Sequence, residues 1–269
     1  MSFFKKLFEK KECSICGGEI GLLGNRKLED GNCCKNCAGK LSVWFDDRRH
    51  STVEQIQAQL AYREENRTAL NSFRPTMTFG DYYTLRAELD QGVPSRFVVE
   101  RDNYMDENAD LILFKDVTSF EIDIDEDERE LTYKNNEGKE VSYTPPRYEY
   151  NYNFYAKLYV NNPYFDDIRF RLNNDTVVLE PLPNRSVVLR NFNRGNFDPS
   201  VYPEYRQYKM VCEELEELFK AGMQGLTLDG HAPAAAVEQP AAPAGPKFCT
   251  NCGAPADGGK FCQYCGAQF

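Results

Sequence analysis

Eight cysteines arranged as four Cys-x-x-Cys pairs constrain this 269-residue chain more than any other feature. Two thiolates at this spacing can bind one metal ion, and two such pairs complete a tetrahedral shell. Two pairs lie towards each end of the chain, which predicts two small metal modules on either side of a longer middle region. The pairs are Cys13 and Cys16, Cys34 and Cys37, Cys249 and Cys252, and Cys262 and Cys265.

The beginning of the chain predicts a cytoplasmic protein with reduced thiols. The opening residues, MSFFKKLFEKKE, alternate charged with apolar side chains and lack the apolar core of a signal peptide. No stretch approaches the roughly 18 apolar residues that cross a membrane. Reduced cysteines at this spacing are expected to be metal ligands and not disulfides.

The last residues, 247–269, resemble a short zinc ribbon. The run Lys247-Phe-Cys-Thr-Asn-Cys-Gly-Ala repeats as Lys260-Phe-Cys-Gln-Tyr-Cys-Gly-Ala. Each copy is a knuckle, in which a glycine after the second cysteine permits a tight turn. So short a segment buries too little surface to fold alone, and metal binding must supply its folding free energy. The expected zinc ligands are Cys249, Cys252, Cys262 and Cys265.

The first two pairs predict a different zinc module at residues 12–45. Cys13 and Cys16 are followed by glycine, as in a knuckle, and the dipeptide at Gly24 predicts a hairpin turn. Cys37 is followed by Ala-Gly-Lys-Leu, which places it at the start of a helix, where exposed amides favour a thiolate. A knuckle, a hairpin and a helix-borne pair resemble a treble clef.

The neighbouring Cys33 leaves the choice of ligand open. The Cys-x-x-Cys spacing favours Cys34 with Cys37 and leaves Cys33 unused. Because protein thiolates fill all four positions of each site, we expect structural zinc, one ion per site. Iron in a rubredoxin-like site is the alternative, since four sulfurs suit both metals. Cys212 is expected to be a buried thiol with no metal role.

One stretch of the N-terminal module resembles a known family. The run from Asp30 to Cys37, DGNCCKNC, is similar to the D-G-x-x-C-K-x-C motif of a bacterial family, domain of unknown function 4428. The resemblance covers residues 12–60. It implies a zinc-binding protein and no activity.

Residues 46–95 predict a connecting helix and a linker. Ser51-x-x-Glu54 is typical of a capping box, and Pro75 ends the helical run. The stretch from Arg63 to Arg67 is polar, so little burial is expected there. The apolar stripe of the helix consists of Val53, Ile56, Leu60, Leu70 and Phe73.

Residues 96–225 predict a β-rich domain within an α+β multidomain chain. The strands are expected at 97–99, 111–114, 117–124, 131–133, 148–160, 168–172, 177–179 and 187–189, with turns near Gly138, Pro145, Pro163 and Asn174. An amphipathic helix from Pro203 to Gly222 follows. Short strands at this density predict an antiparallel barrel or sandwich closed by the helix. This order of elements resembles a pleckstrin-homology-like domain.

Two further segments lie outside these domains. Residues 226–246 are rich in alanine and proline and predict a flexible linker. Residues 1–11 set four apolar side chains among four lysines. Such a short amphipathic segment is expected to dock on the protein, with a membrane surface as the alternative.

Two further runs have a structural explanation. Carboxylates crowd between Glu121 and Glu130, but the glycine and closing glutamate of a calcium loop are missing, so a solvated strand end and turn is expected. The aromatic run from Tyr148 to Phe154 has no interleaved basic residues. It is expected to form one face of a strand and not a stacking platform for bases.

Charge and motifs point away from catalysis. The chain has two histidines and none of the common nucleotide-binding or hydrolase motifs, so no enzyme activity and no small-molecule substrate is predicted. Its net charge is −10, without a basic stripe for nucleic acid. We expect a non-enzymatic zinc protein that acts as an adaptor through protein–protein contacts. Weak nucleic-acid binding through the zinc modules, and membrane association through residues 1–11, are the alternatives.

Overall fold

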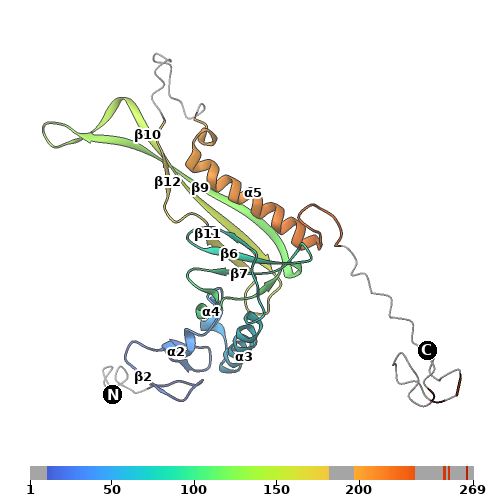
Figure 1. Ribbon diagram of the computed structural model, residues 1–269. Coiled ribbons are helices and arrows are strands. Elements are labelled where there is room, and N and C mark those ends of the chain that lie inside the picture. Colours follow the sequence, from blue (N-terminus) through green and yellow to red (C-terminus); the bar gives the residue numbers. More distant parts are fainter. Residues whose placement is uncertain (1–10, 182–196, 234–250, 253, 255–264, 266–269) are drawn as a thin grey trace, which may run out of the picture. The chain divides into compact units, whose positions relative to one another are not determined.

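The computed structural model (Figure 1) describes residues 11–181 and 197–233, together with positions 251, 252, 254 and 265. The chain divides into two compact units, Met1–Pro233 and Ala234–Phe269. The predicted strand at 187–189 and most of the predicted ribbon lie outside the described residues. Helices and antiparallel sheets are mixed in the first unit, in agreement with the α+β class.

Two short hairpins and a helical turn form the N-terminal module. Its elements are β1 (Lys11–Glu12), β2 (Glu19–Ile20), β3 (Arg26–Lys27), β4 (Asn32–Cys33), α2 (Lys35–Ala38) and the 3-10 turn η1 (Asp47–His50). β1 pairs with β2 and β3 with β4, both antiparallel. Ile20, Leu28 and Leu41 are buried in its core with three of its cysteines. The helix-borne second cysteine pair is confirmed. The hairpin predicted at Gly24 is wrong: the turn spans residues 21–24, and β2 and β3 pair with β1 and β4 and not with each other.

Helix α3 (Val53–Leu70) begins with a capping box that is shifted by one residue from the prediction. The Thr52 hydroxyl accepts from the Gln55 amide at 3.3 Å, and the Gln55 side chain accepts from the Thr52 amide at 2.8 Å. Ser51 cannot serve as the cap because its hydroxyl donates to the Asp47 carbonyl at 2.9 Å and closes η1.

The first sheet contains two strands that the sequence analysis missed. Its order is β5 (Met77–Phe79), β6 (Thr84–Asp90), β7 (Val93–Glu100) and β8 (Ile112–Leu113). The prediction of a linker up to residue 95 is therefore wrong. Leu85 and Ala87 alternate with less buried residues along β6, and the turn to β7 contains Gln91 and Gly92 in the left-handed region. Helix α4 (Tyr104–Glu107) and the 3-10 turn η2 (Phe114–Asp116) flank β8.

The second sheet is built on one long hairpin. β9 (Val117–Lys134) pairs antiparallel with β10 (Glu140–Val160), and β11 (Asp167–Arg171) and β12 (Val177–Leu179) lie along the other edge of β10. The turn near Gly138 is confirmed. The break predicted at Pro145 is wrong, because β10 continues through both prolines with a register shift between Ser142 and Arg147.

The described strands do not close into a barrel. β5–β8 and β9–β12 form separate sheets with no hydrogen-bonded pairing between them. The second sheet is bordered by β9 on one side of β10 and by β11 and β12 on the other, and none of these strands pairs with a strand of the first sheet.

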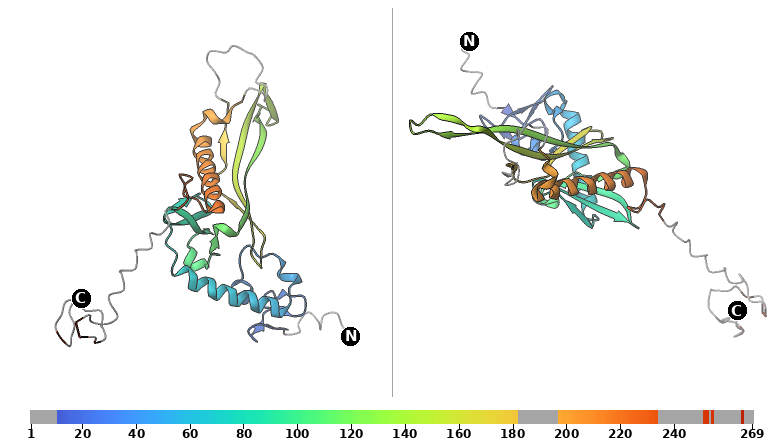
Figure 2. Two further views of the ribbon diagram at one scale, coloured as in Figure 1. Left: turned by 90° about the vertical axis from the view of Figure 1, so that its right-hand side faces the viewer. Right: turned by 90° about the horizontal axis from the view of Figure 1, so that it is seen from above.

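Helix α5 (Pro203–Gln224) joins the two sheets in one hydrophobic core. It packs against β7 and β9 and runs alongside the long hairpin (Figure 2). Phe219 stacks on Phe120 at 4.3 Å between ring centroids, and Cys212 is fully buried, as predicted. The predicted end at Gly222 is wrong: a Cβ there would lie 2.5 Å from the Phe114 ring, so this glycine permits close packing. Gly225, at φ 66, ends the helix.

Among the described residues, every helix is too short or too polar to cross a lipid bilayer.

Candidate metal centre

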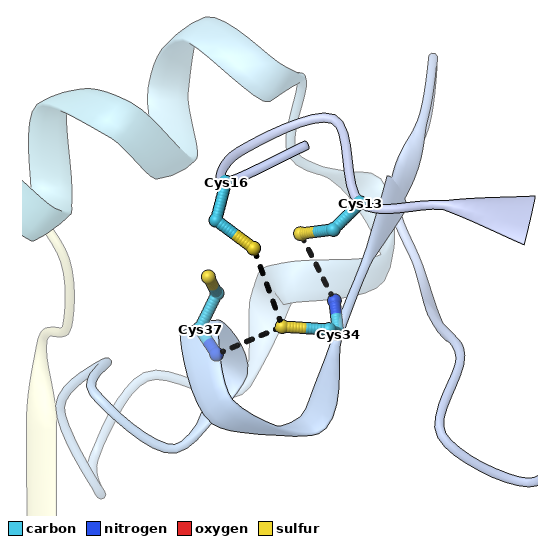
Figure 3. A group of neighbouring side chains, drawn as sticks. All are labelled: Cys13, Cys16, Cys34 and Cys37. Atoms are coloured by element: carbon cyan, nitrogen blue, oxygen red, sulfur yellow. Dashed lines mark hydrogen bonds between the residues drawn. The ribbon is translucent and has the colours of Figure 1, made fainter. Parts of the chain in front are cut away.

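Four cysteine sulfurs meet in the N-terminal module (Figure 3). The Sγ atoms of Cys13, Cys16, Cys34 and Cys37 all lie within 4.8 Å of one another. The Sγ atoms of Cys16 and Cys34 are 3.8 Å apart. Ligands about 2.3 Å from a zinc ion at the centre of a tetrahedron lie about 3.8 Å from each other. The spacing therefore fits one four-coordinate ion.

The first pair is held by a tight knuckle after β1. The Cys13 amide donates to the Gly18 carbonyl, and the Gly17 amide donates to the Cys13 carbonyl, both at 2.8 Å. Gly17 has φ +71, a left-handed conformation that favours glycine. The turn directs Cys13 and Cys16 to the same side of the loop.

The second pair is held by the start of α2. Cys34 is the N-cap residue, and its sulfur accepts from the Cys37 amide at 3.4 Å. The Cys34 amide in turn donates to the Cys13 sulfur at 3.2 Å. Amide donors of this kind stabilise thiolates, so the backbone that orients the sulfurs also favours their metal-binding form.

The four sulfurs lie so close together that their thiolate charges would repel one another, and a bound cation would offset this repulsion. Burial acts to raise the pKa of Cys13, but backbone amides, foremost those of Cys16 and Cys34, lower it to about 6. The pKa of Cys37 is raised by its burial and by the neighbouring cysteine sulfurs. The Cys13 thiolate is thus stabilised by backbone amides, whereas a thiolate at Cys37 lacks a positive charge to stabilise it. A divalent ion with a preference for four sulfurs supplies that charge, and Zn²⁺ fits the donor set.

Cys33 stands outside the group of four. Its side chain is fully buried in the module core, and its sulfur contacts the Cys34 carbonyl at 3.5 Å. Burial and the nearby Cys13 and Cys34 raise its pKa to about 11. The structure thus brings Cys34, and not Cys33, together with the other three.

Solvent reaches the centre from one side. Cys13 and Cys37 are buried, whereas Cys16 is exposed and Cys34 half-buried. Cys16 and Cys37 also line a cleft of about 700 Å³ whose other walls come from α3 and the α4 region, including Leu60, Arg67 and Asp106. A metal ion therefore has a path to the sulfurs from this cleft.

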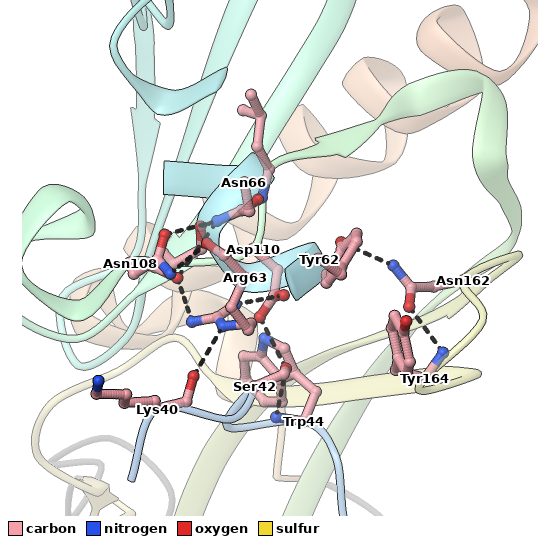
Figure 4. A network of polar contacts seen from close by, with 12 residues as sticks. Lys40, Ser42, Trp44, Tyr62, Arg63, Asn66, Asn108, Asp110, Asn162 and Tyr164 are labelled. Carbon is pink, nitrogen blue, oxygen red and sulfur yellow. Dashed lines mark hydrogen bonds and ion pairs between the residues drawn. The ribbon is translucent and has the colours of Figure 1, made fainter. Parts of the chain in front are cut away.

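A buried polar network next to the cleft was missed by the sequence analysis (Figure 4). Arg63 Nη1 donates to Asp110 Oδ1 at 2.6 Å, and the Ser42 hydroxyl donates to Asp110 Oδ2 at 2.8 Å. Asn66 donates to Asn108 Oδ1 at 2.9 Å. The expectation of little burial between residues 63 and 67 is wrong. The signal in the sequence was spacing, because Arg63 and Asn66 occupy helical positions that continue the apolar face of α3. The buried residues of this face are Ile56, Gln59, Arg63, Asn66 and Leu70.

Only part of the C-terminal ribbon falls within the described residues. Cys252 and Cys265 are described and exposed, and Asn251 donates to the Cys265 sulfur at 3.5 Å. The other two expected ligands, Cys249 and Cys262, lie outside the described residues. The second zinc site therefore stays a prediction.

The two other runs singled out in the sequence have structural roles. The acidic run from Glu121 to Glu130 lies entirely within β9, so the strand end and turn predicted there are wrong, and the run cannot form a calcium-binding loop. Tyr150, Tyr152 and Phe154 are buried on one face of β10, which confirms the predicted strand face.

Comparison with known proteins supports one part of the chain. A search of curated proteins and a search of solved structures found no match. Residues 11–59, which contain all four clustered cysteines and the first part of α3, match the family Domain of unknown function (DUF4428), as the motif had predicted for residues 12–60.

Proposed function

We propose that the N-terminal module binds one structural Zn²⁺ ion and that the chain is a non-enzymatic adaptor that binds other proteins. The gathering of four sulfurs within 4.8 Å carries the zinc assignment. Four protein ligands leave no coordination position for a substrate, as in structural zinc sites. A second zinc ion in the ribbon is proposed from the repeated knuckle alone.

Metal analysis of the purified full chain tests the zinc assignment. Two sets of four cysteines should give about two zinc ions per chain, and Cys34→Ala should remove one of them. Cys33→Ala is the matched control, because Cys33 is the adjacent residue and lies outside the cluster. It should keep the metal content of the wild type. Loss of zinc from both variants, or from neither, would contradict the assignment.

The outer part of the β9–β10 hairpin supports an adaptor role. No residue from 128 to 147 is buried, and the ribbon extends away from the rest of its sheet (Figure 1). A two-stranded ribbon with no covered face gains little stability by itself. We therefore assign it to contact with another macromolecule.

The side chains of this ribbon suit a protein partner. Tyr133 and Tyr143 pack at 5.0 Å between ring centroids, and the Arg147 guanidinium lies 4.6 Å from the Tyr143 ring. Tyrosine and arginine are enriched at the centres of protein interfaces. Residues 128–147 carry four acidic and four basic side chains, so they lack the positive charge that attracts nucleic acid.

Partner capture with the full chain tests the adaptor role. Bound proteins are compared between the wild type, a Tyr133→Ser/Tyr143→Ser variant, and a control that changes the exposed Met210 of α5 to serine. A partner that the wild type and the control retain, and the tyrosine variant loses, supports the proposal. The same bound proteins for all three would reject the ribbon as the contact.

A further inference from the structure

One of the four clustered sulfurs is open to solvent, and a second one beside it is partly open. Cys16 is exposed and Cys34 half-buried, whereas Cys13 and Cys37 are buried. The Sγ atoms of Cys16 and Cys34 lie 3.8 Å apart (Figure 3). A zinc-bound sulfur is a thiolate, and thiolate character and exposure govern the oxidation of cysteine. Cys16 is therefore the sulfur that an oxidant reaches first.

The cleft beside the metal centre leads a small molecule to Cys16. Its volume is about 700 Å³, whereas one water molecule occupies about 30 Å³. The charged residues that line it are Lys40, Arg63, Arg67, Glu64, Asp106 and Glu107, three of each sign. With its charges balanced, the cleft suits a small neutral oxidant better than an ion, and hydrogen peroxide belongs to that class.

We propose that the N-terminal module is a redox switch, in which peroxide joins Cys16 to Cys34 and thereby removes the zinc ion. The proposal rests on the proposed zinc site and adds its regulation. The Cys16 sulfur attacks one peroxide oxygen, the O–O bond breaks, and the leaving hydroxide takes a proton from solvent. The Cys34 sulfur then attacks the sulfur of the resulting sulfenic acid, so an S–S bond forms and a second hydroxide leaves and is protonated. In total, two thiolates lose two electrons, and one peroxide with two protons becomes two water molecules.

The bridge removes two of the four ligands at once. Cys13 and Cys37 remain, and two sulfurs cannot complete the shell of a structural zinc ion. Cys34 is the N-cap residue of α2 and lies 18 positions after Cys16, so the new bond links the knuckle to the start of α2 in place of the metal. Such a cross-link limits the unfolding of the zinc-free module, so a reductant and added zinc can restore the site.

Peroxide treatment of the zinc-loaded full chain tests the switch. The parent for these measurements is Cys249→Ser/Cys252→Ser/Cys262→Ser/Cys265→Ser, in which only the N-terminal module keeps its cysteine cluster. Equimolar hydrogen peroxide, left to react to completion, should release about one zinc ion per chain, measured with a chelating dye. Dithiothreitol with added zinc should restore the metal content. Zinc that stays bound overturns the switch, whereas a chain without zinc before peroxide is added contradicts the zinc site itself.

Peptide mapping identifies the bridge. Tryptic cleavage at the basic residues between the two cysteine pairs places Cys16 and Cys34 on different peptides, which oxidation should join. Cys33→Ala, added to the parent, leaves Cys34 as the only cysteine of its tryptic peptide and should keep the zinc, because Cys33 lies outside the cluster. Fragmentation of the joined peptides should assign the other sulfur to Cys16. A bridge between any other pair of cysteines, or no bridge, overturns the proposal.

A matched pair of α3 variants tests the route through the cleft without a change to any ligand. Ala61→Phe places a ring in the cleft that Ala61 lines together with Cys16. Ala69→Phe places the same ring at an exposed position of α3 that does not line the cleft. Both should bind zinc as the parent does, but peroxide should release zinc severalfold more slowly from Ala61→Phe and at the parent rate from Ala69→Phe. Equal rates for the two variants would show that peroxide does not enter through the cleft, and would overturn the proposal.

Discussion

Replacing Arg63 by methionine is expected to destabilise the contact between the N-terminal module and the β-rich body. The side chains of Arg63 and Asp110 are only 5% and 1% exposed. Arg63 also donates to the Lys40 carbonyl at 3.2 Å and to the Asn108 carbonyl. After the change, the Asp110 carboxylate keeps the Ser42 hydroxyl but loses its buried positive partner. Removal of one member of a buried ion pair costs about 3–5 kcal/mol.

Two further variants should differ from Arg63→Met in how much folding stability they lose. Asp110→Asn leaves Arg63 with its two carbonyl acceptors, so the expected loss is smaller, about 1.5–3 kcal/mol. The double variant Arg63→Met/Asp110→Leu contains no buried charge at this position. It should be more stable than Arg63→Met alone, because the unpaired carboxylate is gone.

The sign of the pH dependence distinguishes these variants. Burial raises the pKa of Asp110, and Arg63 and Ser42 counteract this. Loss of Arg63 raises that pKa further. A carboxyl whose folded pKa lies above its unfolded value destabilises the fold at pH values above the folded pKa, and this cost disappears as the pH falls to the unfolded value. The deficit of Arg63→Met should therefore shrink on acidification, and that of Asp110→Asn should not.

Urea unfolding followed by tryptophan fluorescence measures these differences. Trp44 is the only tryptophan, and its amide donates to the Ser42 hydroxyl at 3.1 Å, so its emission reports on the network directly. The reasoning fails if Arg63→Met unfolds at the same urea concentration as the wild type. It also fails if the double variant is the least stable of the three.

Three other predictions concern the metal and the core. Chelation of zinc should unfold the N-terminal module, measured as loss of amide-exchange protection there, because its small core depends on the ion. Cys34→Ala should show the same loss of protection without chelator, and Cys33→Ala should not, since only Cys34 belongs to the cluster. Gly222→Ala should cost about 1–3 kcal/mol in urea unfolding, because its Cβ would overlap Phe114, whereas Gly21→Ala, with no atom within 4 Å of the added carbon, should unfold at nearly the wild-type midpoint.

The metal module was predictable because its signals are local. Each Cys-x-x-Cys pair closes within one turn, and the glycines after Cys16 specify the turn of the knuckle directly. The hairpin predicted at Gly24 failed because β2 and β3 pair with other strands. The choice of Cys34 over Cys33 also followed from spacing along α2. The distance in sequence between the two cysteine pairs did not hinder the prediction, because local sequence determines the conformation of the knuckle and of the helix start separately.

The strands were harder to delimit because pairing, not pattern, decides their length. Residues 125–130 of β9 are exposed at every position, so they show no alternation and resemble a strand end. They remain in the strand because each is paired with a residue of β10 between 148 and 153. A turn prediction at Pro145 failed for the same reason, since distant pairing outweighs local preference.

The buried face of α3 explains how a polar stretch can attach one module to another. Ile56 belongs to the core of the metal module, and Leu70 packs with Val98 in a separate cluster near the first sheet. Between them, Arg63 and Asn66 make the hydrogen bonds to residues 108–110. Apolar contacts hold the two ends of the helix, and polar contacts fix its position between them.

The family match ends at residue 59, at the point on α3 where the contacts change from the module to the body. Ile56, which completes the module core, lies inside the match, and Arg63, which binds Asp110, lies outside it. Metal binding and attachment thus depend on different residues of one continuous helix and its neighbours. Arg63→Met should therefore keep the zinc content of the wild type while it loses stability, and Cys34→Ala should lose zinc while the Arg63–Asp110 pair stays formed. A loss of zinc from Arg63→Met would show that the two are coupled and would contradict this division.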